Sequence, residues 1–249
     1  MIMIQKRKIN FQISLDHGIN GWFQNSYENW EENTFTVFDK FLSNDKIYID
    51  IGAWIGPIVL YACQKSSKVI CFEPDPIAQK ILTDNISINN FKNIISYNYA
   101  ISDKEGTAIL NSNYTNFAGS VSTLLSVETG TVISGQTCEV KTVILENVLS
   151  ELNIDPRSIS LIKIDIEGGE KFVVPQIINY LEKTKIPLYI SIHWCFLYEK
   201  DAINIIELLW KIYHNVYDNG KKTVMEEIIN NYRTTKLQTT DLLFTDSTW

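Results

Sequence analysis

Short, continuously apolar segments alternate along the chain with longer segments whose apolar residues recur at helical spacing. The first kind predicts buried strands and the second predicts amphipathic helices. Strands are expected at 46–51, 68–73, 93–100, 160–167 and 187–194, and helices at 57–65, 75–90, 170–183 and 202–213. This alternation is typical of a mostly parallel sheet whose two faces are both covered by helices.

Two segments depart from the alternation. Residues 1–45 are mixed and rich in aromatic side chains, and helical spacing within them predicts a helix at 34–42. Residues 102–141 are rich in Ser, Thr, Asn and Gly. We expect this second segment to contain short antiparallel strands at 107–112 and 138–143 around a loop.

Composition narrows the class of protein. The 249 residues are 45% hydrophobic and 12% aromatic, which is enough for one substantial core. The net charge of -7 argues against a nucleic-acid partner, since no basic run is longer than QKRK at residues 5–8. The four cysteines form no C-x-x-C pair, as is usual for free thiols in a reducing compartment. Without a signal-peptide pattern or a segment of membrane-spanning length, we expect a cytoplasmic protein.

A glycine-containing turn, DIGAWIG at residues 50–56, follows the first predicted strand. A dinucleotide fingerprint would need G-x-G-x-x-G, whose middle glycine lets a pyrophosphate approach the backbone. Here Gly52 and Gly56 are separated by three residues, and Trp54 stands where that approach would occur. The turn therefore favours a cofactor without phosphates over NAD or FAD.

An acid ends the second predicted strand. Glu73 lies 21 residues after Gly52, where a carboxylate can accept hydrogen bonds from both hydroxyls of a ribose. The alternative is that Glu73 only caps the helix that follows. A tight glycine turn, a ribose acid and no phosphate cradle together describe S-adenosylmethionine.

Four sequence blocks, taken together, resemble a known family. They read YIDIGAWIGPIVLYA, VICFEPDPIA, NYAISDKEGT and LIKIDIEGGEKFVV, and the similarity covers roughly residues 30–194. In order and spacing they are similar to the signature blocks of the FkbM-family methyltransferases. The resemblance implies a Rossmann-like, class I methyltransferase fold with seven strands, the last antiparallel (240–245), and S-adenosylmethionine as cofactor. It also implies O-methylation of sugars or natural products.

The alternation of strands and helices predicts the domain organisation, and the resemblance implies the cofactor contacts. We expect a single methyltransferase domain over 1–249, with an N-terminal helical and aromatic extension (1–45), a cofactor-binding core (46–195) and a C-terminal completion of the sheet (196–249). The resemblance places Asp50, Gly52, Ala53 and Gly56 around the methionine part of the cofactor, Glu73, Pro74 and Asp75 at the ribose, and Ala100 and Ile101 at the adenine. Within NWEENTF, Glu31 and Thr34 would contact the amino-acid end, and Asp165 would also touch the cofactor. An exposed helix-capping role for Glu31 is the alternative.

The reacting centre is predicted at two strand ends. Lys163, Asp165 and Glu167 alternate onto one side of a strand, and buried charges are costly unless they pair or serve a site. An internal lysine–carboxylate pair is the alternative. His193 ends the next strand and is the favoured general base, with Asp165 second and Lys163 beside them. Family members often carry an acid two residues before this histidine, whereas this chain has Ser191.

A metal and a substrate loop are further expectations. Asp165, Glu167 and His193 could ligate Mg²⁺ or Mn²⁺, although their spacing does not require a metal. The loop at 114–124 has the polar and aromatic mix that suits a sugar. We expect hydrogen bonds from Ser120 and Ser122, next to Glu167 and His193, and stacking by Tyr114 or Phe117. A solvated connection is the alternative for this loop.

These observations predict an O-methyltransferase that acts on a sugar hydroxyl of a glycan or a glycosylated metabolite. A nucleic-acid or protein methyltransferase is one alternative, but the [DN]-P-P-[YFW] block of base methylation is replaced by DIEG at residues 165–168. A non-catalytic, cofactor-binding partner of a glycan-assembly complex is another, and an NAD-dependent oxidoreductase a third. Fusion to, or complex formation with, glycosyltransferases is also open.

Overall fold

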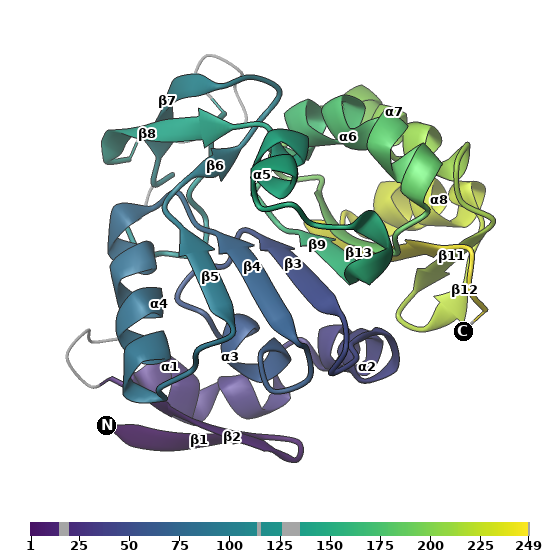
Figure 1. Ribbon diagram of the computed structural model, residues 1–249. Coiled ribbons are helices and arrows are strands. Elements are labelled where there is room, and N and C mark those ends of the chain that lie inside the picture. The colour runs from purple at the N-terminus through teal and green to yellow at the C-terminus, as the bar shows by residue number, and fades with distance from the viewer. Residues whose placement is uncertain (15–19, 114–115, 126–134, 249) are drawn as a thin grey trace.

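The computed structural model describes residues 1–14, 20–113, 116–125 and 135–248, and Figure 1 shows its course. The strands of its largest sheet are β3 (Ile47–Ile51), β4 (Lys68–Phe72), β5 (Ile94–Tyr97), β9 (Ile159–Ile164), β10 (Leu188–His193), β11 (Asn215–Asp218), β12 (Lys221–Lys222) and β13 (Thr239–Thr245). They are arranged in the order β12-β11-β13-β10-β9-β3-β4-β5.

Parallel pairing dominates this sheet. The pairs β10–β9, β9–β3, β3–β4 and β4–β5 are parallel, whereas β13 runs antiparallel to both of its neighbours. From β3 the chain proceeds outward to β4 and β5, and then returns to the other side of β3 with β9 and β10. The Rossmann-like class I methyltransferase architecture is confirmed. Ligands of such sheets bind at the carboxyl ends of the strands, where the strand order reverses.

The sheet has one strand more than the seven predicted. β12 is a two-residue strand that pairs antiparallel with the end of β11. Asn219 and Gly220 connect them with φ angles of 48° and 73°. Asn-Gly is the preferred pair for a turn with positive φ at both central residues, so this dipeptide adds an edge hairpin to the sheet.

Helices cover both faces of the sheet. The helices are α1 (Asn20–Asn25), α2 (Glu32–Phe41), α3 (Val59–Ala62), α4 (Pro76–Ile88), α5 (Leu145–Glu151), α6 (Glu170–Thr184), α7 (Glu199–Trp210) and α8 (Met225–Thr235), with short 3₁₀ turns η1 (Tyr27–Asn29) and η3 (Pro156–Ser158). Alternate strand residues pack into two separate clusters, one with α5, α6 and α7 and the other with α2, α3 and α4. Figure 1 shows α4 beside β5 and α6 beside α7.

Two smaller sheets flank the large one. β6 (Ala100–Ile101), β8 (Thr137–Val143) and β7 (Gly106–Asn111) form one, with the antiparallel β7–β8 pairing expected for this region. β1 (Ile2–Lys6) and β2 (Ile9–Ile13) form an N-terminal hairpin, at the bottom of Figure 1. The prediction of a purely helical and aromatic extension missed this hairpin, because the basic run at its turn hides the alternation.

Two further differences concern helices and membranes. The helix predicted at 57–65 is only the single turn α3, since the amides of Gln64 and Lys65 donate three residues back instead of four. None of the helices in the described part of the chain has the length and apolar character needed to cross a membrane. That residues 1–249 form a single domain stays a prediction.

Candidate active site

A cavity of about 350 Å³ opens at the carboxyl ends of β3, β4, β9 and β10. This is the edge of the sheet at which the strand order reverses, and the volume is in the range of small-molecule sites. Most of the predicted site residues line it: Glu31, Gly52, Ala53, Glu73, Pro74, Ala100, Ile101, Ser120, Ser122, Lys163, Asp165, Glu167 and His193. The structure brings these residues together, while their roles stay predictions.

Gly52 begins one end of the cavity, which we call the glycine-turn end. Its φ is 93°, and a β-carbon built on it would lie 1.8 Å from the backbone oxygen of Asp165. Only glycine fits between these two strand ends. The amides of Gly52 and Ala53 both donate to the carbonyl of Phe72, which ties the turn to the end of β4.

Glu73 completes the glycine-turn end. Its two carboxylate oxygens accept the amides of Trp54 (2.7 Å) and Asp75 (2.8 Å), and burial raises its pKa to about 8. When the group is ionised, each oxygen keeps a second lone pair for a ligand hydroxyl. The side chain of Asp75, not that of Glu73, caps α4, which argues against the capping alternative.

Four residues expected around the cofactor do not line the cavity: Thr34, Asp50, Gly56 and Asp75. Asp75 is occupied with the protein itself, since it caps α4 and accepts the amide of Ala118 (2.6 Å) and the hydroxyl of Ser122 (3.3 Å). It therefore fixes the loop that carries Ser120 instead of facing the cavity.

The other three residues lie behind the cavity wall. Thr34 is buried, and its hydroxyl donates to the carboxylate of Glu31 at 2.9 Å. Glu31 itself does line the cavity. Asp50 is buried and accepts the hydroxyl of Tyr48 (3.0 Å). Gly56 is enclosed by α4, where a β-carbon would lie 2.5 Å from Leu82. Their geometry supports the wall and gives them no direct contact with a ligand.

A second part of the cavity, which we call the charged end, is an ionisable cluster. Nε2 of His193 lies 3.3 Å from Asp165 and 3.4 Å from Glu167, and its Nδ1 lies 2.9 Å from Glu170. Lys163 binds the other oxygen of Asp165 at 2.6 Å. Because Glu170 is an acceptor, Nδ1 donates to it and Nε2 is turned toward the two cavity carboxylates.

Burial and mutual charge set the pKa values in this cluster. Burial alone would lower the pKa of His193, but the charges of Glu170 and Glu167 outweigh it and raise the pKa well above its usual value. Burial raises the pKa of Glu167 to about 8. Burial would also raise the pKa of Asp165, but Lys163 and His193 hold it below its usual range. The cluster thus keeps a proton on or near Nε2.

Two acids of this region escaped the sequence analysis. Glu170 is the first residue of α6, is fully buried and orients His193. Asp241 lines the cavity from β13, directly opposite Ser191 in the strand register, and accepts its hydroxyl at 2.7 Å. The carboxylate missing at residue 191 is therefore supplied by the neighbouring strand. A lone acid within the apolar run of β13 was the available signal.

Strained backbone gathers around the cavity. Seven described residues other than glycine and asparagine have positive φ angles. Four are at or beside the cavity wall, namely Glu31, Trp54, Ala118 and Glu167, with φ of 48°, 48°, 71° and 52°. The other three lie elsewhere, Arg7 in the hairpin turn and Lys185 and Lys236 at helix ends. Three of the four line the cavity, and the carbonyl of Ala118 accepts the indole N–H of Trp54 at 2.8 Å. Such conformations cost energy and concentrate where function over-determines them.

The N-terminal hairpin holds one side of this wall in place. The ammonium of Lys6, which is 1% exposed, donates to the carbonyls of Tyr27 (3.1 Å), Glu28 (2.7 Å) and Trp30 (2.8 Å). These carbonyls belong to η1 and the turn that leads to Glu31. Lys6 thereby positions Trp30 and Glu31, both of which line the cavity.

The loop at 116–125 crosses the cavity as a strap. It is tied to Asp75 and Trp54 at Ala118, and Thr123 donates to the carbonyl of Glu167 at 2.6 Å. Ser120 and Ser122 line the cavity as expected. Phe117 instead packs in a small cluster with Leu110 and Val140, so the expectation that it faces a ligand is not met. Tyr114 lies outside the described residues.

The proposed metal ligands fit a divalent cation in kind. Asp165, Glu167 and His193 each offer one ligand atom, and these atoms lie within 4.8 Å of one another. Two carboxylates and an imidazole suit Mg²⁺ or Mn²⁺, and Glu170 is the outer partner that a metal-bound histidine needs. The Lys163 ammonium on Asp165 competes with a cation for the same carboxylate.

Comparison with known proteins gives a family and distant structural likenesses. The family described as Vibrio cholerae RfbT protein matches residues 12–224. No curated protein matches the chain significantly.

Among solved structures, the methyltransferase FkbM from Methylobacillus flagellatus KT is 16% identical, with a TM-score of 0.49 over 81% of this chain and 44% of that one. This chain thus spans less than half of that protein. An rRNA methylase from Streptococcus thermophilus is 10% identical (TM-score 0.49, covering 88% and 99%). The SMU.1697c protein from Streptococcus mutans, solved in complex with SAH, is 11% identical (TM-score 0.49, covering 86% and 98%). At these TM-scores the likenesses carry no argument about function.

Proposed function

The chain belongs to the family of the Vibrio cholerae RfbT protein, and from this premise and its cavity we propose that it is an S-adenosylmethionine-dependent O-methyltransferase. The acceptor is a sugar hydroxyl of a glycan or glycosylated metabolite. One observation carries the proposal: two features share a single cavity. The first is a glycine turn that lacks the phosphate-binding spacing and is followed by the buried acid Glu73. The second is His193, whose ring is oriented by Glu170. The FkbM-like sequence blocks supply much of that wall.

The glycine-turn end binds the cofactor in this proposal. Gly52 and Ala53 provide backbone next to the methionine part, Glu73 accepts the ribose hydroxyls, and Ala100 and Ile101 flank the adenine. Glu31, held by Thr34, attracts the cofactor's ammonium. When bound, S-adenosylmethionine supplies an electrophilic methyl group, so positioning does much of the catalytic work.

The charged end deprotonates the acceptor. Nε2 of His193 takes the hydroxyl proton once the imidazole is neutral, and the Nδ1–Glu170 hydrogen bond fixes the ring in that orientation. The carboxylates that orient His193 also stabilise its protonated form, so a nearby group must first take that proton. Glu167, 3.4 Å from Nε2, is placed to take it while its own carboxylate is ionised, and it then releases the proton to water. Lys163 keeps Asp165 ionised beside them.

A metal-assisted version of the same reaction stays open. Asp165, Glu167 and His193 would hold Mg²⁺ or Mn²⁺, and the cation would lower the pKa of the bound hydroxyl. Turnover measured after chelation with EDTA, and again after adding back each cation, separates the two versions. Unchanged turnover in EDTA would leave His193 as the base.

Titration calorimetry with S-adenosylmethionine, with NAD as the control ligand, tests the proposed function. We expect micromolar binding of S-adenosylmethionine and none of NAD. Release of S-adenosylhomocysteine in the presence of a glycan acceptor then distinguishes an enzyme from a non-catalytic binding partner. Binding of neither ligand, or of NAD alone, would contradict the proposal.

A further inference from the structure

Three tryptophans meet on the cavity wall, and none of them was part of the predicted site. Trp22 comes from α1, Trp30 from the turn after η1 and Trp54 from the glycine turn, and all three line the cavity. The ring of Trp22 lies 4.9 Å from that of Trp54 and 5.2 Å from that of Trp30, at interplanar angles of 76° and 78°. We call these three residues the tryptophan corner.

The corner is held in place and remains partly open. Each of the three side chains is only half-buried, whereas the layer behind them, with Phe23 and Tyr27, is buried. The indole N–H of Trp54 donates to the carbonyl of Ala118 in the strap. The strap also carries Ser120 and Ser122, which line the same cavity. Since the described residues supply a rigid aromatic surface and nearby hydroxyls, the wall matches a sugar ring, which has an apolar face and a polar rim.

The charge of the cavity narrows the class of sugar. Its acidic lining residues are Glu31, Glu73, Asp165, Glu167 and Asp241. Among the described lining residues the only basic side chains are Lys163 and His193, and both are buried and paired with these acids or with Glu170. The sequence outside the described residues contains no lysine or arginine.

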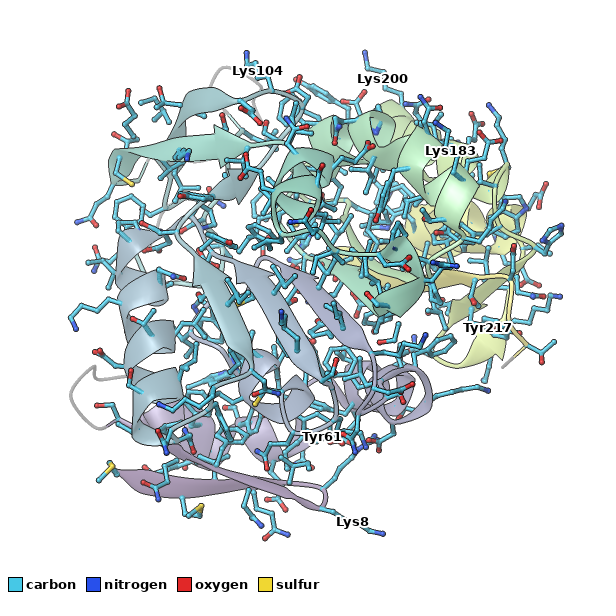
Figure 2. All side chains as sticks on the ribbon, viewed as in Figure 1. Lys8, Tyr61, Lys104, Lys183, Lys200 and Tyr217 are labelled. Atoms are coloured by element: carbon cyan, nitrogen blue, oxygen red, sulfur yellow. The ribbon has the colours of Figure 1, made fainter. Side chains whose placement is uncertain are left out.

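A phosphate would therefore find no free cation among the described lining residues. Anionic groups are bound by free cations or by open helix N-termini. The N-terminus of α4 is capped by Asp75, and α6 begins with the buried carboxylate of Glu170. The basic side chains labelled in Figure 2, such as Lys104, Lys183 and Lys200, extend outward from the surface.

We infer that the tryptophan corner binds the ring of a sugar without anionic groups, already joined to its neighbour by a glycosidic bond. A glycosyltransferase reaction, which releases the nucleoside diphosphate, must then precede methyl transfer. Sugar phosphates, nucleotide sugars and uronic acids are excluded because the described lining residues offer an anionic group no free cation. This inference rests on the proposed function and specifies its substrate class.

Saturation-transfer NMR with irradiation of the indole protons tests the binding itself, without turnover. The probes are methyl glycosides of neutral hexoses, deoxyhexoses and N-acetylhexosamines, together with the matched sugar 1-phosphates and nucleoside diphosphate sugars. Wild-type protein and Trp22→Ala are compared in the presence of S-adenosylhomocysteine. Trp210→Ala is the control, because Trp210 is also half-buried, contacts one aromatic ring and lies outside the cavity.

We expect ring-proton saturation with at least one methyl glycoside and none with the phosphorylated forms. Trp22→Ala should weaken that binding by about 2- to 12-fold, the worth of an aromatic contact, while Trp210→Ala leaves it unchanged. The affinity of Trp22→Phe for the glycoside should fall between those of Trp22→Ala and Trp210→Ala. Because phenylalanine retains much of the packing, this variant distinguishes a lost sugar contact from a folding defect.

Several outcomes would overturn the inference. Saturation of the phosphorylated sugars, no saturation with any methyl glycoside, or equal saturation in Trp22→Ala would each do so. Loss of S-adenosylmethionine affinity in Trp22→Ala with sugar binding intact would assign the corner to the cofactor instead. Failure of the proposed function is a separate result, because it would appear as absent S-adenosylmethionine binding in the wild-type calorimetry.

Discussion

The two ends of the cavity are built in opposite ways. The glycine-turn end consists mainly of backbone from one turn, with Gly52 and Glu73 supplied by adjacent strands. The charged end brings Lys163, His193 and Glu170 together from two strands and a helix, and all three are buried. The first end depends on steric fit, whereas the second depends on charges that cancel one another, since a buried charge without a partner is costly.

The steric character of the glycine-turn end is tested by Gly52→Ala, for which we expect the largest effect. The strained φ costs about 1–3 kcal/mol, and the clash with the carbonyl of Asp165 adds about 1–3 kcal/mol of overpacking. Urea unfolding should show this loss, and calorimetry should show lost S-adenosylmethionine binding. Gly106→Ala is the matched control, because Gly106 has a φ of 140° but open space around it. Equal losses in the two variants would remove the steric argument.

The chemical character of the charged end is tested by His193→Ala. If His193 is the base, turnover should fall by roughly 10²–10⁴-fold while cofactor affinity is kept. His214→Ala serves as the control, since His214 is an exposed histidine paired with Asp246. If turnover survives in His193→Ala, the general base would be Asp165 instead, and His193 would have only a structural role.

Glu73→Ala measures how far the glycine-turn end depends on its one carboxylate. Loss of the acceptor for two ribose hydroxyls should weaken S-adenosylmethionine binding by roughly 1–3 kcal/mol in calorimetry. The exposed Glu105→Ala is the control and should bind as the wild type does. Wild-type affinity in Glu73→Ala would remove the ribose assignment.

The smallest predicted effect is a pH dependence of folding from the same carboxylate. With its pKa raised from 4.5 to about 8, Glu73 keeps its proton in the folded protein where the unfolded chain has lost it. This stabilisation is fully present below pH 4.5 and is lost as the pH rises through 8. Urea unfolding of wild type and Glu73→Gln between about pH 5 and 8 should therefore show the wild type losing stability relative to the variant. Parallel curves would mean that Glu73 is not protonated in the folded protein.

The same contrast explains what the sequence could predict. The strands β3, β4, β9, β10 and β13, the helices α4 and α6 and the glycine turn follow from local patterns of apolar periodicity and glycine spacing. Pairings between distant segments do not follow. The position of Asp241 opposite Ser191 depends on the register of β13 against β10, and the tryptophan corner depends on where α1 packs.

Which residues face the cavity was equally hard to predict from spacing alone. Asp50 and Gly56 are close in sequence to Gly52, but both lie behind the turn, where Asp50 accepts the hydroxyl of Tyr48 and Gly56 packs against Leu82. Asp75 lies two residues after Glu73, but its carboxylate caps α4 and accepts the amide of Ala118 in the strap. Local patterns therefore identified the right turn, while side-chain direction was settled by tertiary packing.

The buried ammonium of Lys6 makes the chain terminus part of the binding wall, and this bears on proteolysis. Arg7 and Lys8 form the turn of the N-terminal hairpin, where trypsin can cleave, and Lys8 is exposed. A cut there would release β1 together with Lys6 and leave the carbonyl of Trp30 without its donor. A ligand bound at the tryptophan corner would oppose that release. Resistance to trypsin at the hairpin turn would therefore report that the cavity is occupied.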